Sequence, residues 1–446
     1  MSSDLRFKKV LLMRVDFSGR RQAIDWANIL LVLPYLLLTL VPYFKLRFRF
    51  ILALPFVALW LFRNIILNKR CFFSHHFLVF SSAFVAFLSL RLTMYSIIDG
   101  TLSFYVLFVS NCLSVFPIFM MYYLYRNNCI LEIKILAMIV IICMASGAIS
   151  SMGVDMAEAR VLASVAKDYD MEIDRLELMN KSVATYGSVY GMGLIVVAIF
   201  YGWKKFAIKT RVFMTFIMLL FGYGIVRAAY STAVVATIAG MMFASIALVI
   251  RCRAKLLRRI CFSICFLLVM ITAFPQVLGF LSEPIRGLAR QIETYEYSMR
   301  LESIADAFSG YKDSYAAARS GLYWLSFDTF LQHPIIGKYI YRFLFNESGA
   351  FVVHDYIGGH SLFFDTLGQL GLFGFSLLAL SAWSYRRYLH DFYVHTYNPE
   401  GEISCACAYY ALLLASCLNP TITPEIMLAF VFVVPALPLF YRKTYL

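Results

Sequence analysis

The sequence predicts an all-α protein, a polytopic integral membrane helical bundle, from three observations. Of its 446 residues, 61% are hydrophobic and only 15% are charged, and the mean hydropathy is +0.74. Soluble domains are about 45–50% apolar and about 25% charged. The apolar residues form segments of membrane-spanning length, and Lys and Arg concentrate in alternate connections. This composition excludes a soluble enzyme, a disordered chain and a nucleic-acid-binding domain.

About twelve segments have the length and apolar character of transmembrane helices, which need about 20 residues. Residues 227–231 alone separate the seventh segment from the eighth, so one interrupted unit is an alternative there. Residues 1–25 precede the first helix and are basic, and no cleavage pattern follows that helix, so we expect it to be retained. The segments are 26–43, 51–68, 73–90, 102–125, 133–152, 182–202, 211–226, 232–250, 260–281, 361–384, 403–419 and 426–441.

The distribution of basic residues predicts the orientation of the chain. Lys and Arg collect on the cytoplasmic side of membrane proteins. With the N-terminus inside, that side receives the basic runs 204–205, 251–259, 386–387 and 442–443. Both termini are therefore predicted to be cytoplasmic. Basic residues at 45–49 fall in the first external loop, where they bind headgroups or substrate, or indicate that the first hairpin is misplaced.

Two external connections are long. The first, near 153–181, is acidic with apolar residues at helical spacing, and lies within residues 26–281, the predicted helices one to nine. The second is the large loop 282–360, between helices nine and ten; residues 361–446 hold helices ten to twelve and a short cytoplasmic C-terminus. Connections this long are usually functional, so we expect the chemistry on the external face. No internal repeat is visible, unlike the duplicated halves of many secondary transporters.

His360 is the first catalytic candidate, because it ends the long loop in Gly358-Gly359-His360-Ser361-Leu362. An unperturbed histidine side chain has a pKa near 6.5, so a histidine at this position could accept a proton at neutral pH. The alternative is a histidine that is merely solvated at the membrane surface.

The helix after His360 carries Ser361, Asp365 and Gln369 at i, i+4 and i+8. This single polar stripe should face the protein interior or a watery cavity, because polar groups in lipid are costly. The alternative role is helix packing. Three glycines, Gly368, Gly371 and Gly374, predict close contact with a neighbouring helix.

Arginine and aromatic side chains are the candidate substrate-binding groups. Arg227 ends the seventh helix, and its planar fork suits phosphate or carboxylate; snorkelling to headgroups is the alternative. Arg319, Tyr323 and Trp324 lie in an amphipathic segment of the long loop, with an interfacial helix as the alternative. Two further loop candidates are weaker, because ordinary surface charges explain them equally: Arg290 and Arg300.

Neither a metal site nor a cofactor is expected. His75 and His76 lack neighbouring carboxylates, and the histidines of the long loop do not have metal-ligand spacing. Cys405-Ala-Cys407 has no matching second pair. All ten cysteines lie in or beside apolar segments, so no disulfide framework is indicated.

Three elements, in order, resemble a known family. The first is Arg227-Ala-Ala. The second is Arg319-(x)4-Trp324-(x)8-His333-Pro-Ile-Ile-Gly337, and the third is His360-Ser-Leu-(x)8-Leu370-Gly-Leu-Phe-Gly374. Together with the long external loop, they resemble the O-antigen ligase and polymerase superfamily, including Wzy-type polymerases. The resemblance covers roughly a third of the chain. Ser361 departs from the usual Asn of the family, and Gln369 stands where an acid is common.

The resemblance implies a metal-independent, type-C-like glycosyltransferase in the bacterial inner membrane, acting at the periplasmic face. His360 would be its general base, and Arg227 and Arg319 would bind a diphosphate. The implied partners are undecaprenyl-diphosphate-linked glycan donor and acceptor, membrane lipids and a chain-length regulator protein.

Four functions remain open at this point. The first is a repeat-unit (O-antigen) polymerase, which transfers the growing glycan to a lipid-linked repeat unit in lipopolysaccharide biosynthesis. The second is the ligase, which transfers finished glycan to lipid A-core. More distant are a flippase or other transporter and a non-enzymatic assembly scaffold. The long external loop and the absence of repeats favour an enzyme.

Overall fold

The computed structural model describes residues 24–41, 49–67, 75–96, 100–127, 129–150, 185–228, 230–250, 254–273, 279–291, 295–309, 315–338, 344–345, 351–352, 357–395 and 399–442. Within these ranges the chain is helical, apart from one antiparallel pair of two-residue strands, β1 (Leu344–Phe345) and β2 (Phe351–Val352). The predicted helical loop near 153–181 and most of the predicted segment 1–25 lie outside the described residues.

Each of the twelve predicted apolar ranges overlaps a helix. The first nine are α2 (Trp26–Leu40), α3 (Arg49–Leu67), α5 (His75–Ser96), α6 (Gly100–Arg126), α7 (Ile130–Ser150), α10 (Tyr186–Gly202), α11 (Ile208–Arg227), α12 (Ser231–Ile250) and α13 (Ala254–Ala273). The last three are α17 (Leu362–His395), α18 (Pro399–Leu418) and a final segment of α19 (Pro424–Met427), the π-helix η5 (Leu428–Val433), α20 (Val434–Ala436) and the 3-10 helix η6 (Leu437–Phe440).

Two predicted boundaries are wrong. The predicted helix 260–281 is α13, which begins at Ala254 and ends at Ala273, shortly before Pro275. Good helix formers precede position 260, and a proline disfavours helix in the residue before it. α17 continues past 384 to His395, because no Gly or Pro lies between residue 384 and Pro399. α11 and α12 are two helices, which removes the alternative of a single interrupted unit.

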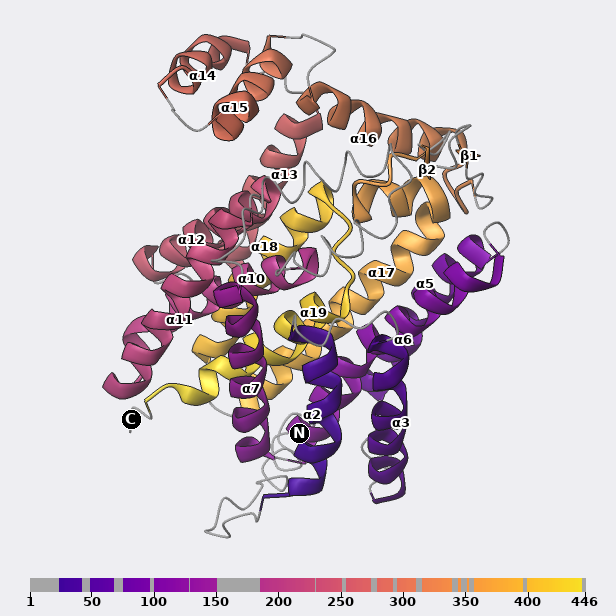
Figure 1. Cartoon of the computed structure of the whole chain (residues 1–446), viewed down its shortest axis with the longest axis vertical. Coiled ribbons are helices and arrows are strands. Elements are labelled where there is room, and N and C mark those ends of the chain that lie inside the picture. Colours follow the sequence, from indigo (N-terminus) through magenta and orange to yellow (C-terminus); the bar gives the residue numbers. More distant parts are fainter. Residues whose placement is uncertain are drawn as a thin grey trace, which may run out of the picture.

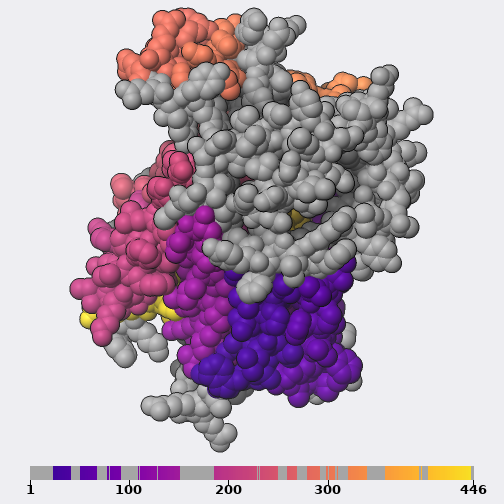
Figure 2. Space-filling model, in the orientation of Figure 1, coloured from indigo at the N-terminus to yellow at the C-terminus, as the bar shows by residue number. Residues whose placement is uncertain are grey.

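Six described helices are long and apolar enough to cross a membrane, which is the character of a multi-pass helical membrane protein. They are Ile130–Ser150, Tyr186–Lys205, Ile208–Arg227, Thr232–Val249, Leu362–His390 and Glu400–Leu418. The surface agrees with this character. α11 exposes one apolar stripe at helical spacing, which suits lipid better than water: Ile208, Val212, Phe216, Leu219, Tyr223 and Val226. α2 and α3 form the lower front of the molecule in Figure 2 (indigo), and α3 also exposes large apolar side chains.

Three helices lie in the region predicted as the long loop. They are α14 (Ser282–Ala289), α15 (Tyr295–Phe308) and α16 (Tyr315–Gln332), and they sit together at one end of the bundle (Figure 1). Arg286 joins α14 to α15 through an ion pair with Asp306 at 2.8 Å, and it also pairs with Glu283 of its own helix at 2.5 Å. The hydrogen bond to Asp306 and the charge of Glu283 raise the pKa of Arg286.

The opposite end of the bundle is tied together by polar contacts. Arg63 of α3 pairs with Asp25 at 2.8 Å, beside the start of α2. Lys205, which follows α10, forms an ion pair with Glu400 of α18. The backbone N–H of Arg442 donates to the Lys205 carbonyl at 2.8 Å. These contacts hold the start of α2 and the end of η6 at the end away from α14–α16.

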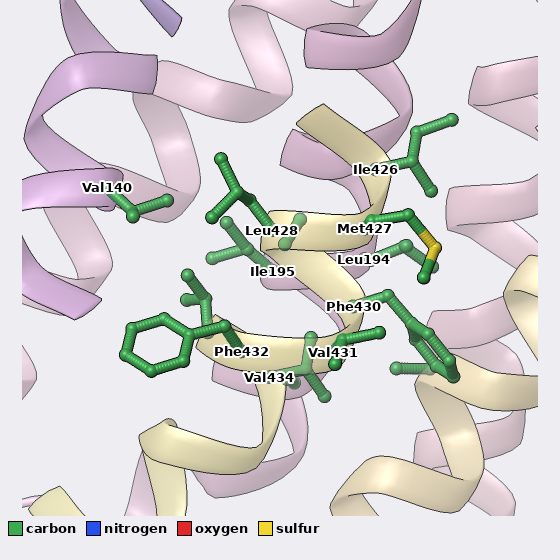
Figure 3. Packing of buried hydrophobic residues seen from close by; sticks show 14 of the residues in the cluster. Val140, Leu194, Ile195, Ile426, Met427, Leu428, Phe430, Val431, Phe432 and Val434 are labelled. Carbon is green, nitrogen blue, oxygen red and sulfur yellow. The ribbon is translucent and has the colours of Figure 1, made fainter. Parts of the chain in front are cut away.

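The final segment forms the centre of the core. Leu428, Phe432 and Val434 are completely buried, and Val140 of α7 and Ile195 of α10 pack around them (Figure 3). Apolar burial of this kind contributes roughly 25 cal/mol per Å² in water-soluble cores, and in lipid close packing takes over that role.

A buried tyrosine compensates for a proline in α6. In a regular α-helix the carbonyl of Leu113 accepts from the N–H of residue 117, but Pro117 has none. The hydroxyl of Tyr35, on α2, donates to the Leu113 carbonyl at 2.9 Å instead. Tyr35 is completely buried, so no water replaces this bond.

Two more tyrosines donate hydrogen bonds to carbonyls that lack a backbone donor in the final segment. In the π-helix the carbonyl of Phe430 would accept from residue 435, which is Pro435, and Tyr385 of α17 donates to it at 3.1 Å. In the following 3-10 turn the carbonyl of Pro435 would accept from Pro438, and Tyr393 donates to it at 2.7 Å. Backbone breaks inside a bundle require such partners.

We expect the Tyr35 hydroxyl to stabilise the fold only while Pro117 is present. Tyr35→Phe leaves a buried carbonyl unsatisfied and should lower the free energy of unfolding by about 1–3 kcal/mol. In a Pro117→Ala background, which restores the N–H, the same substitution should cost well under half as much. Equilibrium unfolding of the four purified proteins in detergent measures this coupling; an equal cost in both backgrounds would contradict it.

Candidate functional site

The segment that carries His360 is a short, tightly held turn into α17. Gly359 has a φ of +66°, which favours glycine, and an added Cβ at Gly358 would lie 2.4 Å from the carbonyl oxygen of Leu322 in α16. Ser361 caps α17, since its Oγ accepts from the N–H of Phe364 at 3.1 Å. His360 itself is exposed, beside a rigid backbone.

Asp365 and Ser326 hold this turn in place through hydrogen bonds. The Ser326 hydroxyl, on α16, donates to Asp365 Oδ1 at 2.6 Å and accepts from the N–H of Gly358 at 2.9 Å. Asp365 Oδ2 accepts from the N–H of Ser361 at 2.9 Å. The residues on both sides of His360 are thus bonded to one buried pair, Ser326 and Asp365, and Asp365 is only 9% exposed.

The predicted polar stripe of α17 faces the protein interior. Ser361, Asp365 and Gln369 are all buried, at 0%, 9% and 3% exposure. The prediction that the stripe avoids lipid is confirmed. The carboxylate of Asp365 accepts hydrogen bonds from Ser326 and from the backbone of Ser361. Asp365 is therefore a group that orients the His360 turn.

Tyr323 connects α16 to the end of α18. Its hydroxyl donates to the carbonyl of Leu418 at 3.0 Å, and its ring stacks on Phe364 with centroids 5.6 Å apart. The side chain is 5% exposed. The neighbouring Trp324 is more open, at 39% exposure, and packs edge-on against Phe327. Of the two aromatic candidates, Trp324 is therefore the one available to a ligand.

The second and third sequence elements interlock through their backbones. α17 is broken at Gly371, whose φ is +58° and ψ −157°. The bonds lost at the break are replaced by the turn after α16: Leu372 N–H donates to Pro334 at 2.8 Å, and Lys338 N–H donates to Gly368 at 2.9 Å. Phe373 N–H likewise donates to Ile335 at 3.0 Å.

Two glycines permit this contact. An added Cβ at Gly337, where φ is +66°, would lie 2.3 Å from the Gln369 carbonyl. One at Gly371 would lie 2.6 Å from the backbone nitrogen of Gly337. The predicted close approach of the α17 glycines is thus a contact with a turn, formed where the helix is interrupted.

Asn419 joins the His360 turn to the start of α12. Its side-chain amide donates to Tyr190 of α10 at 2.7 Å and to Thr232 of α12 at 2.5 Å. Its carbonyl accepts from the N–H of Leu362 at 3.3 Å. These bonds join α12 to the third sequence element, and Arg227 ends α11 only a few residues before Thr232 in the sequence.

The structure describes the side chains of two of the four arginine candidates. Arg227 is exposed at the end of α11, and Arg290 is exposed in the turn after α14. α14 packs on α15, α15 on α16 and α16 on α17, so Arg290 is separated from α17 by two helices. Arg300 and Arg319 lie in α15 and α16, and their side chains are outside the described part of the chain.

Sequence reasoning missed Ser326, Asn419 and Arg91. Arg91, near the end of α5, is the opposite charge that acts on Asp365, and α5 packs along α17. A lone Ser or Asn in an apolar segment has no distinctive spacing. The only available signals were the Asn419-Pro420 pair after a helix, and an arginine inside an apolar segment.

The described residues offer an exposed imidazole before α17 and an exposed indole on α16, two elements that polar contacts join, and an exposed guanidinium at the end of α11. Among them, no group of three His, Cys, Asp or Glu side chains could hold a metal ion. The available chemistry is proton transfer and anion binding. No family model matches the chain, and no curated protein matches it.

We expect Gly371 to be essential for the interlock. Gly371→Ala places a side chain at positive φ against the backbone of Gly337, and should destabilise the protein by more than about 1 kcal/mol. Gly321→Ala is the control, because a Cβ there meets open space on helix α16. Thermal unfolding in detergent should show a lower midpoint for Gly371→Ala and an unchanged or higher one for Gly321→Ala. Equal midpoints would contradict the interlock.

We expect Ser326→Ala to weaken the His360 turn, because it leaves both Asp365 Oδ1 and the Gly358 N–H short of a buried partner. The predicted loss is about 1–3 kcal/mol of unfolding free energy. Ser381→Ala is the matched control: that serine is also buried in a helix but only bonds back to Leu377 of its own turn. If both variants unfold alike, Ser326 does not hold the turn.

Proposed function

We propose that this chain is a repeat-unit polysaccharide polymerase of the O-antigen type. It would transfer a growing glycan from undecaprenyl diphosphate to a lipid-linked repeat unit, without a metal. One observation carries the proposal: the second and third family-like elements, far apart in the sequence, pack against each other, and the first ends shortly before Thr232, which is bonded to the same cluster. Gly337 meets Gly371, Ser326 meets Asp365, and Asn419 links Thr232 to Leu362.

The proposed reaction is a displacement at the anomeric carbon of the donor sugar. A hydroxyl of the acceptor sugar attacks that carbon, and its proton passes to the His360 imidazole. The bond from the anomeric carbon to the phosphate oxygen breaks, and undecaprenyl diphosphate leaves with the bonding electrons. A base positioned in this way contributes about 10²–10⁴-fold in rate.

The other candidate residues have roles that match their chemistry. Arg227 and Arg319 would bind the diphosphate, whose charge grows as it leaves, and fixed cations stabilise such charge. Trp324 would stack on the apolar face of a sugar. Asp365 and Ser326 would act through the backbone on both sides of His360, which keeps the imidazole directed at the acceptor. Arg290 and Arg300 would contribute further positive charge at the edge of the proposed substrate site.

The proposed topology has twelve transmembrane helices in the bacterial inner membrane, with both termini in the cytoplasm. Residues 282–360 would form the periplasmic face. Two observations support it: a helix overlaps each of the twelve apolar ranges, and α14–α16 lie at the end opposite the start of α2 (Figure 1). The basic runs would then lie on the cytoplasmic side.

We expect His360→Ala to abolish transfer while substrate still binds. With purified protein and a lipid-linked repeat unit, chain extension should fall about 10²–10⁴-fold. Affinity for the lipid-linked substrate should change only a few-fold, and a chelator should not affect the wild type. His390→Ala is the control, because His390 lies at the other end of α17 and pairs with Glu402.

Two results would contradict the proposal. One is full extension by His360→Ala, and the other is an equal loss in both histidine variants. A wild-type protein that moves the lipid-linked glycan across proteoliposomes but never extends it would instead be a transporter.

A further inference from the structure

Five large apolar side chains are exposed together where α16 ends and α17 is broken. This hydrophobic wedge consists of Leu331, Ile335, Ile336, Leu372 and Phe373, each at least half exposed and Ile335 the most, at 72%. The backbone bonds between the turn and α17 bring its two halves side by side. It lies at the end of α16, within the large external loop predicted from the sequence, and in the first turns of the helix that follows.

The wedge is held rigidly. Ile335 is bonded through its carbonyl to Phe373, and its neighbour Pro334 to Leu372. A Cβ at Gly337 or Gly371 would collide with the backbone of the other segment, so the turn and α17 are in direct backbone contact. The backbone that carries the two isoleucines is therefore fixed, and both side chains lie exposed on the described surface.

The wedge continues into the lipid-facing side of a helix that is long enough to cross a membrane. Beyond Phe373, the exposed large side chains of α17 are Leu380 and Trp383, at helical spacing from it. The stripe ends in charge, because Arg387 lies over the Trp383 ring at 5.5 Å. An apolar stripe that ends in an aromatic and a cation is typical of a helix side that crosses hydrocarbon and stops at its surface.

Polar side chains surround the other end of the wedge. Asp328 and Gln332 are exposed on the last turns of α16 and bond to each other at 2.7 Å. Lys338 is exposed directly after the turn. An apolar tip with a polar rim is the distribution that an interfacial helix shows when its apolar side enters the bilayer.

We propose that the wedge is embedded in the hydrocarbon of the leaflet at the α14–α16 end, with lipid acyl chains as its occupant. α16 is then a surface helix that is anchored at its C-terminal end, and the break at Gly371 lies just inside the bilayer. Continuity with the α17 stripe selects lipid as the occupant. The proposal does not depend on the reaction that the protein catalyses.

The test is a depth measurement by spin-label power saturation on the full chain in lipid nanodiscs. A nitroxide is attached through a p-acetylphenylalanine placed singly at Ile335, Ile336 or Phe373, which avoids the ten native cysteines. Leu380 is the reference for hydrocarbon and Gln332 for water. Each labelled protein must first show the gel-filtration profile of the unlabelled protein.

Embedding predicts that labels at all three wedge positions collide with oxygen as readily as at Leu380, and are shielded several-fold from water-soluble nickel relative to Gln332. Collision with nickel equal to that at Gln332 would overturn the proposal, because the wedge would then face water. Shielding from both oxygen and nickel would also overturn it, because the wedge would then be covered by protein, such as a second copy of the chain.

Discussion

Backbone hydrogen bonding without water is the constraint on which the rest of this structure depends. Inside a bilayer an N–H or carbonyl that leaves the helix pattern must find its partner in the protein. Several described breaks have such a partner. Tyr35, Tyr385 and Tyr393 donate to carbonyls that prolines leave without a donor. At Gly371 the partner is a second piece of backbone, the turn after α16.

This constraint also determines where chemistry can occur. In a continuous helix the backbone N–H and carbonyl groups bond to one another, and the outer surface can face lipid. A broken helix instead needs polar groups from a neighbouring segment that approaches it closely. The His360 turn, the Gly371 break and the Asn419 junction lie near one another because each supplies the polar partners that another needs. Ser326 and Asp365 bond to the His360 turn, the turn after α16 bonds across the Gly371 break, and Asn419 bonds to the backbone of α17 immediately after His360. In the proposed enzyme, the same bonds direct the base and join its turn to the start of α12.

Much of the fold could be predicted from sequence, because apolar segments of spanning length depend on local composition alone. The stripe of Ser361, Asp365 and Gln369 was predicted to face inward for the same reason, and it does. The break at Gly371 could not be predicted, because three glycines at helical spacing equally suit an unbroken, closely packed helix. α14 and α15 were not predicted, because they lack a long apolar repeat. The hydrogen bonds of Ser326, Asn419 and the tyrosines could not be predicted, because their partners are distant in sequence.

The central claim is that this chain extends a lipid-linked glycan, and the most direct measurement is the lipopolysaccharide ladder of a strain that lacks the gene. The proposal predicts core capped by a single repeat, with the long ladder absent and restored by the wild-type gene. Core without any repeat, together with long lipid-linked glycan, would contradict the polymerase and indicate a ligase. An unchanged ladder would contradict both for this polysaccharide.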